Sequence, residues 1–164
     1  MIHMRLLFGL LALLAMNACG FEPIYATRRG SDVSTELASI RVSPIADRSG
    51  QILRNYLLDR LTPLGQSQAS RYTLNIRLSE PRQTLALRRD DVISRTGYSA
   101  SATYELLDGS GKRVVGGIST FSTDYEITSS EYATLVSQQN ARDRVLELVS
   151  DDIRGQLAAH FRMR

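Results

Sequence analysis

The sequence is poor in the side chains that most often carry catalysis or bind metals. Its 164 residues include one cysteine, Cys19, two histidines and no tryptophan. A lone cysteine cannot form an internal disulfide, and a Cys–His pair or a His-based metal cluster needs more of these residues. Two carboxylate pairs, Asp90 with Asp91 and Asp151 with Asp152, are adjacent in sequence, so their members point apart on a strand or a helix. The sequence therefore predicts no catalytic residue, no metal site and no cofactor, and it indicates a protein that is not an enzyme.

The chain also lacks an apolar run long enough to cross a membrane. Its longest run, residues 6–16, has about 11 residues, whereas a transmembrane helix needs about 20. Arg5 precedes this run, and Ala18 and Cys19 follow it, which resembles a bacterial lipoprotein signal. We expect residues 1–18 to be removed and Cys19 to become a lipidated first residue, although Met16 stands where leucine is usual. The alternative is an ordinary secretory signal with an incidental cysteine, which would leave a reactive thiol in an exported protein.

Lysine is nearly absent from the basic residues. Lys112 is the only lysine, and the other basic residues are arginines, which give a net charge of +3 and a pI of about 9.3. Arginine binds phosphate with two parallel hydrogen bonds, although genome base composition explains the excess equally well. Gly20 follows Cys19 where an aspartate would resemble the inner-membrane retention signal. We therefore expect the outer membrane as the location, no nucleic acid as a partner, and a polyanion such as the phosphates of lipopolysaccharide.

The chain that follows the signal has the length of one domain. Removing residues 1–18 leaves 146 residues, enough for a single hydrophobic core. Residues 19–36 are expected to form a lipidated N-terminus and a polar tether, because Pro23 disfavours a helix there. Residues 37–164 are expected to form a single α/β domain.

Hydrophobic periodicity predicts the elements of this domain, since alternation indicates strands and spacings of three and four indicate helices. The expected strands are residues 37–43, 71–79, 94–107 and 112–125, with further extended structure at 85–87, and the expected helices are 51–64 and 129–161. The expected core comprises Leu57, Leu74, Ile76, Tyr104, Leu106 and Val149. The predicted fold class is α+β, a two-layer α/β sandwich in the order β-α-β-β-β-α. Its four-stranded sheet is mostly antiparallel, with two helices packed on one face.

Some local features are predicted in more detail. Residues 108–111 read as a hairpin turn by composition, and Ser130 is expected to cap the last helix. Gly116 and Gly117 are expected to mark a bulge or bend in their strand. The last helix is expected to bend or break near residues 137–140 or at Gly155.

Two pairs of basic residues are candidates for binding a polyanion. Arg88 and Arg89 follow the extended segment 85–87, and Lys112 and Arg113 follow the hairpin turn. Exposed cations of this kind attract phosphate through charge and hydrogen bonds. Ordinary solvated arginines, balanced by Asp90 and Asp91, are an equally simple explanation.

The chain resembles the lipopolysaccharide-assembly lipoprotein (LptE) family in its alphaproteobacterial form. Residues 19–25, Cys-Gly-Phe-Glu-Pro-Ile-Tyr, are similar to the start of the mature lipoprotein. The second half is similar at Arg95, Tyr98, residues 104–108, Tyr125, Ser130, Tyr132, Ala133, Asn140, Ala141, Arg144, Ile153, Leu157 and Phe161. The family order of elements, strand-helix-three strands-helix, agrees with the order predicted above.

The resemblance implies a role in binding rather than catalysis. LptE proteins lie as a plug inside the outer-membrane barrel LptD, help that barrel to assemble, and bind lipopolysaccharide during its export. The implied partners are an LptD-like barrel, lipopolysaccharide and, through the lipid on Cys19, the membrane. One alternative is an accessory lipoprotein of another envelope lipid-transport machine, which acts by protein binding. Another is a lipid-anchored hydrolase, which the missing nucleophile constellation disfavours.

Overall fold

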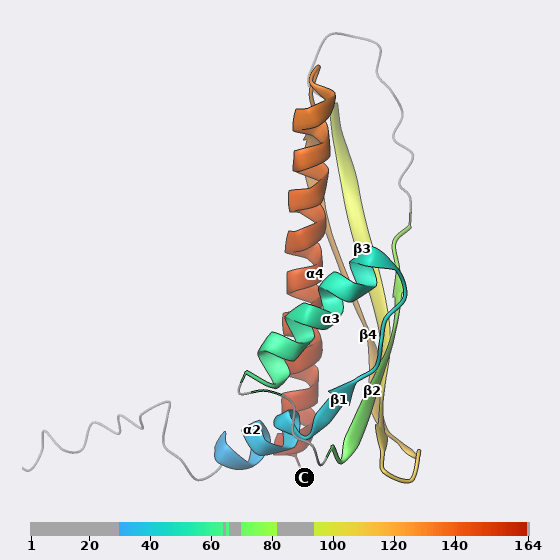
Figure 1. Cartoon of the computed structure of the whole chain (residues 1–164), viewed down its shortest axis with the longest axis vertical. Helices are drawn as coiled ribbons and strands as arrows, with labels where there is room; N and C mark the ends of the chain where they lie inside the picture. The colour runs from blue at the N-terminus through green and yellow to red at the C-terminus, as the bar shows by residue number, and fades with distance from the viewer. Residues whose placement is uncertain (1–29, 64, 66–69, 82–93, 164) are drawn as a thin grey trace, which may run out of the picture. The chain divides into compact units, whose positions relative to one another are not determined.

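The computed structural model describes residues 30–63, 65, 70–81 and 94–163. Three helices and four strands follow one another in this part of the chain (Figure 1). Their bounds are α2 (Gly30–Ala38), β1 (Ile40–Val42), α3 (Asp47–Leu61), β2 (Tyr72–Ser79), β3 (Ser94–Asp108), β4 (Arg113–Ile127) and α4 (Glu131–Arg162). From β1 onward this is the order predicted from the sequence, and the α+β class is confirmed.

The four strands form one sheet in the order β1-β2-β3-β4. β1 is parallel to β2, and the other two pairings are antiparallel. β1 pairs only with Tyr72, Thr73 and Leu74, whereas β2 continues to Ser79. β2 in turn pairs with β3 only from Ser101 onward. The sheet therefore loses one strand after Leu74 and a second after Ser79, and beyond that point β3 and β4 are the described strands that continue.

The start of the domain differs from the sequence prediction. The predicted strand 37–43 is shorter, because Leu37 and Ala38 end helix α2 and the strand begins at Ile40. Part of the expected tether, from Gly30 to Glu36, also lies in α2. Leu37 is buried, as an inward-facing strand residue would be, although it lies in a helix. Three alternating residues are too few to distinguish a strand from the end of a helix by their pattern. The extended segment expected at residues 85–87 lies outside the described residues.

The irregularity in β4 occurs before the glycines rather than at them. Leu106 pairs with Val115 and Leu107 pairs with Arg113, so Val114 is the extra residue. The prediction of a bulge at Gly116 and Gly117 was therefore wrong. A Cβ on Gly117 would lie 3.0 Å from the hydroxyl oxygen of Tyr104, so this glycine makes room for the tyrosine of the neighbouring strand.

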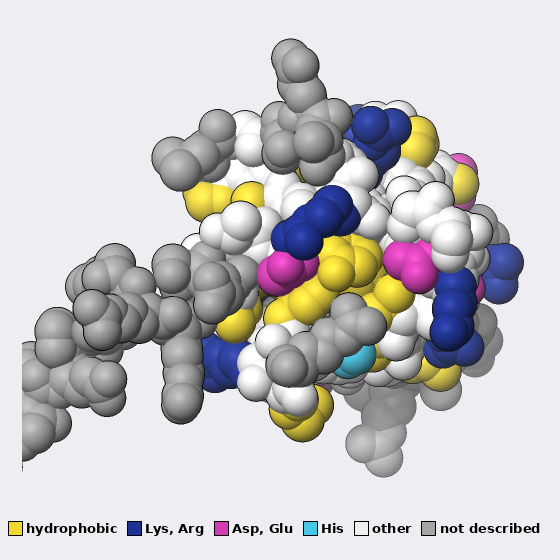
Figure 2. All heavy atoms as spheres, turned by 90° about the horizontal axis from the view of Figure 1, so that it is seen from below, with side chains coloured by type: hydrophobic (Ala, Val, Ile, Leu, Met, Phe, Trp, Pro, Cys, Tyr) yellow, Lys and Arg dark blue, Asp and Glu magenta, His cyan; other side chains and the backbone are white. Residues whose placement is uncertain are grey.

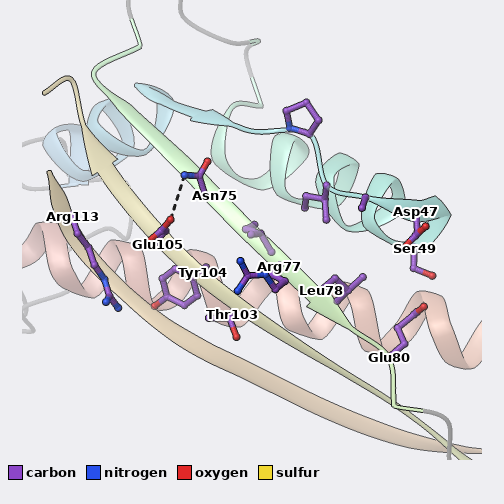
Figure 3. A pocket seen from close by; sticks show the side chains of 14 residues that line it. Asp47, Ser49, Asn75, Arg77, Leu78, Glu80, Thr103, Tyr104, Glu105 and Arg113 are labelled. Carbon is purple, nitrogen blue, oxygen red and sulfur yellow. Dashed lines mark hydrogen bonds between the residues drawn. The ribbon is translucent and has the colours of Figure 1, made fainter. Parts of the chain in front are cut away.

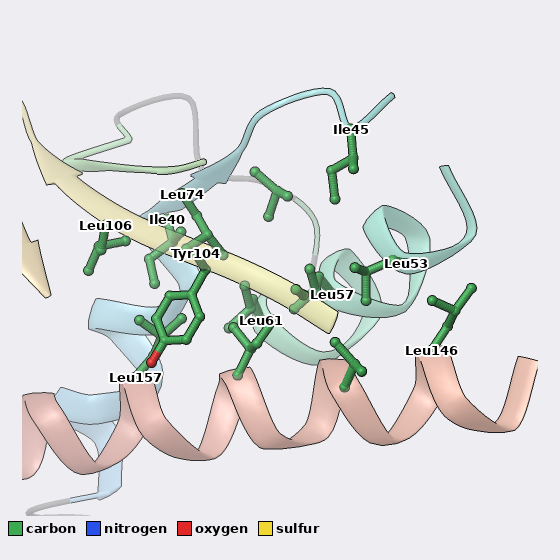
Figure 4. Close-up of a cluster of buried hydrophobic side chains, with 14 of the residues drawn as sticks. Ile40, Ile45, Leu53, Leu57, Leu61, Leu74, Tyr104, Leu106, Leu146 and Leu157 are labelled. Carbon is green, nitrogen blue, oxygen red and sulfur yellow. The ribbon is translucent and has the colours of Figure 1, made fainter. Parts of the chain in front are cut away.

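The hydrophobic core lies between one face of the sheet and the two helices α3 and α4 (Figure 4). The sheet contributes Ile40, Val42, Leu74, Ala100, Ala102, Tyr104 and Leu106, and the helices contribute Leu53, Leu57, Leu61, Val145, Leu146, Val149, Ile153 and Leu157. Of the six core residues predicted from the sequence, all but Ile76 are buried. Ile76 is only partly buried because it lies on β2 beyond the end of β1.

Helix α4 runs from Glu131 to Arg162 as one continuous helix, so the break that was one of the two expectations is not present. The predicted cap is confirmed, since the backbone N–H of Ala133 donates to the hydroxyl of Ser130 at 3.3 Å. The buried residues of α4 begin only at Ala141. Tyr132 and Leu135 lie in the first part of the helix and are 76% and 50% exposed, although both are apolar. The first ten residues of α4 therefore contribute no buried side chain to the core.

The domain end at which α4 finishes joins three elements. Phe161 of α4 packs on Tyr72 of β2 with 5.4 Å between the ring centroids. Arg71, which precedes β2, forms a salt bridge with Glu36 of α2. Figure 2 shows this end, where apolar side chains lie between basic and acidic ones. Among the described helices, none is both long and apolar enough to cross a membrane.

Candidate functional site

A groove of about 690 Å³ lies along β2 in the described part of the chain (Figure 3). We call it the edge groove. One wall is the connection from β1 to α3, and the other is formed by β2, β3 and the start of β4. The lining residues are Pro44, Ile45, Ala46, Asp47, Ser49, Asn75, Ile76, Arg77, Leu78, Glu80, Thr103, Tyr104, Glu105 and Arg113.

The edge groove exists because β1 leaves the sheet early. The backbone N–H of Ser43 donates to the carbonyl oxygen of Leu74 at 3.0 Å, and its hydroxyl donates to Oδ1 of Asn75 at 2.7 Å. Pro44 follows at once, and proline cannot donate to a further strand. Asp47 then starts α3 with a positive φ of 65°, which turns the chain away from the sheet. Beyond Leu74, β2 has no neighbour on this side within the described residues.

Both signs of charge line the edge groove. Arg77 and Arg113 are its cations, and Asp47, Glu80 and Glu105 are its carboxylates. Within the described residues, neither arginine takes part in a salt bridge. Neither guanidinium group is therefore held by a described carboxylate, which suits both for contact with a ligand or a partner.

Arg113 folds back over the sheet rather than extending away from it. Its Nη2 and Nε atoms lie 2.5 Å and 2.8 Å from the position that a Cβ on Gly116 would occupy. Any larger residue at Gly116 would push the guanidinium aside. Gly116 pairs with Glu105 across the strands, so Arg113 lies beside the polar face that carries Asn75 and Glu105.

Two tyrosines near the edge groove act as neutral hydrogen-bond donors. Tyr98 donates to a carboxylate oxygen of Glu80, and Tyr104 donates to Oε1 of Gln156 at 2.5 Å. Burial, and then the bond to Glu80, raise the pKa of Tyr98. Burial, and then the charge of Asp152, raise the pKa of Tyr104. Because both pKa values move up from about 10, these hydroxyls stay protonated at neutral pH.

The hairpin between β3 and β4 fixes the start of β4, which carries Arg113. The backbone N–H groups of Ser110 and Lys112 both donate to Oδ1 of Asp108, at 2.9 and 3.0 Å. Gly111 has a φ of 82°, a conformation that glycine adopts readily. The predicted hairpin turn is confirmed.

The Asp108 turn predicts a pH-dependent stability. Hydrogen bonds from the Ser110 hydroxyl and then from the Lys112 backbone lower the pKa of Asp108 below its ordinary 3.8. A lowered carboxyl pKa stabilises the fold above the ordinary value, and this contribution is lost as the pH falls through the folded-state pKa. Asp108→Asn should therefore lower the melting temperature at neutral pH, and the difference should shrink below about pH 4. Thermal melts from about pH 2 to 7 test this, and a constant difference would contradict it.

The structure can be compared with the basic residues predicted from the sequence. Lys112 and Arg113 are both exposed, and Arg113 lines the edge groove. Cys19, Arg88 and Arg89 lie outside the described residues. Arg77 was not predicted from the sequence, because its place in a strand of period two showed only that it lies on the polar face. No group of three or more His, Cys, Asp or Glu side chains among the described residues could hold a metal ion.

The chain was compared with known proteins. The lipopolysaccharide-assembly (LptE) family model matches residues 37–164. No curated protein matches at a significant level of sequence similarity. A crystal structure of a Caulobacter crescentus CB15 protein described as a lipoprotein is 29% identical, with a TM-score of 0.66 over 77% of this chain and 93% of that chain. A minor lipoprotein from Acinetobacter baumannii is 14% identical, with a TM-score of 0.56 over 73% of this chain and 91% of that chain, which shows a shared fold.

The family match covers most of the chain, including every strand and the helices α3 and α4. Members of this family are non-enzymatic lipoproteins of the outer membrane that take part in lipopolysaccharide assembly. The chain belongs to the lipopolysaccharide-assembly (LptE) family.

Proposed function

We propose that this protein is anchored in the outer membrane by a lipid on Cys19 and forms a complex with an LptD-like β-barrel. In that complex it binds lipopolysaccharide during transport to the cell surface. The observation that carries the proposal is the family match over residues 37–164. A single diacyl anchor holds a domain at the membrane without fixing how it docks, so the domain surface has to supply the docking contacts.

The face of the sheet opposite the helices supports this role. The helices cover one face, and strand alternation places the polar residues of β2 and β3 on the other. Those residues are Thr73, Asn75, Arg77, Ser79, Ser101, Thr103 and Glu105. A large outer-membrane barrel has a polar, water-filled interior. A face of this composition suits that interior, because its side chains keep their hydrogen bonds with water or with the barrel.

Copurification tests the complex. The full-length protein, expressed in its own envelope and extracted in mild detergent, should be recovered with a barrel of much larger mass. Intact-mass analysis of the same sample should give a chain that begins at a lipidated Cys19. Recovery of only soluble or inner-membrane transport components would instead favour an accessory lipoprotein of another lipid-transport machine.

The proposed lipopolysaccharide contacts are Lys112 and Arg113, with Arg88 and Arg89 as the second pair. Replacing Lys112 and Arg113 by alanine should weaken binding of purified lipopolysaccharide by about fivefold at low salt, since exposed ion pairs contribute about 0.2–1 kcal/mol each. The loss should shrink at moderate salt, where charges are screened over roughly 8–10 Å.

The matched control removes the same charge elsewhere. Arg154 and Arg162 are exposed on α4, and their double alanine variant should retain more affinity than either the Lys112 and Arg113 variant or the Arg88 and Arg89 variant. Equal losses in all three variants would show that net charge alone is responsible. The site assignment would then be wrong, and the family membership would be unaffected.

A further inference from the structure

We propose that the free edge of β2 binds an extended segment of a partner protein, which pairs as an additional strand with the backbone of Ile76 and Leu78. The segment carries an acidic residue beside Arg77. The proposal rests on the proposed function only for the identity of that partner, the outer-membrane barrel.

The direction of the β2 backbone identifies the free groups. The carbonyl oxygen of Leu74 accepts from Ser43, and the N–H of Tyr72 donates to Ser39, so both of these residues face the β1 side. N–H and C=O groups alternate between the two edges of a strand. Ile76 and Leu78 therefore face the same side as Leu74, while Asn75, Arg77 and Ser79 face β3, with which they pair.

Within the described residues, no backbone partner is present for Ile76 or Leu78 on this side. Exposed strand edges are templates for pairing with another chain, and an extended peptide that binds in this way gains affinity from main-chain hydrogen bonds. The edge groove lies along this stretch of β2, so the position of an added strand, about 4.8 Å from β2, is open.

Side chains along the edge define the chemistry of the segment. Ile76 and Leu78 are partly buried and pack on the core, with Ile45 on the opposite wall of the edge groove. Alternate residues of the segment that face this way should be apolar. On the other face Arg77 is exposed and makes no salt bridge within the described residues. A carboxylate directly beside it would form a favourable cross-strand pair.

The strand pairing of a barrel restricts which part of the barrel protein can bind to the free edge of β2. Strands in the wall of a closed barrel already pair on both sides. The segment is therefore a loop or another non-wall stretch of the barrel protein. The carboxylates Asp47, Glu80 and Glu105 in the edge groove disfavour the phosphates of lipopolysaccharide as its main occupant.

Proline at position 78 provides a sharp test. Leu78→Pro removes an N–H that faces the free edge and leaves the hydrogen bonds to β3 in place, a position where proline is tolerated. Leu78→Ala is the matched control, because it removes the same apolar side chain and keeps the N–H. The full-length lipoprotein and both variants are copurified with the barrel after melting curves have shown that both variants fold.

We expect Leu78→Pro to recover at least about tenfold less barrel than Leu78→Ala, a difference of about 1.4 kcal/mol. In the complex of the unmodified protein, the amides of Ile76 and Leu78 should exchange hydrogen more slowly than in the free protein. Arg77→Glu should also weaken recovery, and Arg77→Gln should do so less. Equal recovery of the two Leu78 variants, or unchanged exchange at both amides, would overturn the proposal.

A photoreactive residue in place of Ser79 separates this proposal from the proposed function. It should crosslink in cells to a non-wall segment of the barrel, and the adduct should be lost when Leu78→Pro is added. If the barrel does not copurify with the unmodified protein, the proposed function fails. An adduct with an extended acidic segment of another envelope protein, lost with Leu78→Pro, would then still support pairing at this edge. An adduct between two copies of this chain, an adduct with lipid, or no adduct would overturn it.

Discussion

Replacing Leu146 by alanine is expected to lower the free energy of unfolding by about 2–5 kcal/mol, because its side chain is fully buried between α4 and the rest of the core. The loss combines the transfer free energy of the deleted atoms with the cavity that they leave. Leu74→Ala in β2 should cost a similar amount, since Leu74 is also fully buried. Denaturant unfolding followed by circular dichroism measures both.

Leu148 provides the matched control for Leu146. It lies two residues further along α4 and is 46% exposed, so Leu148→Ala deletes the same atoms from a site that already contacts water. We expect a cost below about 1 kcal/mol, because much less apolar surface is buried there. Equal costs for the two variants would mean that the inner face of α4 is assigned incorrectly.

Two helical glycines should respond to alanine with opposite signs. A Cβ on Gly50 in α3 would lie 2.7 Å from Cγ2 of Ile45 and 3.0 Å from its carbonyl carbon, so the backbone before the helix would have to move. Overpacking of this kind costs about 1–3 kcal/mol, which should exceed the gain in helix propensity of about 1 kcal/mol. Gly50→Ala is therefore expected to destabilise the protein.

Gly155 in α4 is exposed, and apart from its chain neighbours and the backbone of its own helix no atom lies within 4 Å of the position of its Cβ. Gly155→Ala should therefore stabilise the protein by about 0.4–1 kcal/mol, as alanine restricts the unfolded chain and suits the helix. The melting temperatures of Gly50→Ala and Gly155→Ala, compared with that of the unmodified protein, test both expectations. A shift in the same direction for both would show that contact with Ile45 does not govern Gly50.

The parts of the fold that the sequence predicted well are those with a long regular pattern. In residues 94–107 the alternation placed Tyr98, Ala100, Ala102, Tyr104 and Leu106 on one face, and all of them except the partly buried Tyr98 are buried. The cap at Ser130 and the hairpin turn were also predicted, because their hydrogen bonds form between residues close in sequence. In each case the pattern of neighbouring residues, or the hydrogen bonds between them, was sufficient to predict the structure.

The features that were missed depend on contacts between distant segments. The apolar residues Tyr132 and Leu135 fit a helical stripe, yet they are 76% and 50% exposed, and the buried residues of α4 begin only at Ala141. The bulge at Val114 depends on the pairing of β4 with β3, which the two glycines could not indicate. Neither the exposure of the start of α4 nor the pairing of β4 with β3 can be predicted from a local sequence pattern.

The edge groove likewise contains one arginine that the sequence indicated and one that it did not. Arg113 was identified by its charge and by its position after a turn, whereas its place in the edge groove depends on Gly116. Arg77 became a candidate only when the structure showed that β1 ends at Val42 and leaves the following part of β2 without a neighbour among the described strands. Strand pairing is a property of the assembled sheet, so the free edge could not be read from either strand alone.

The unequal lengths of the strands imply that the domain is not uniformly rigid. Where all four strands are present, α3 and α4 enclose the core, whereas beyond Ser79 the described residues comprise β3, β4 and the start of α4. Segments with few buried contacts open locally at a lower free-energy cost than the whole domain unfolds. The region of Ser94, Ile127 and Glu131 can therefore adapt its shape to a surface that it meets, while the core holds the rest of the molecule fixed.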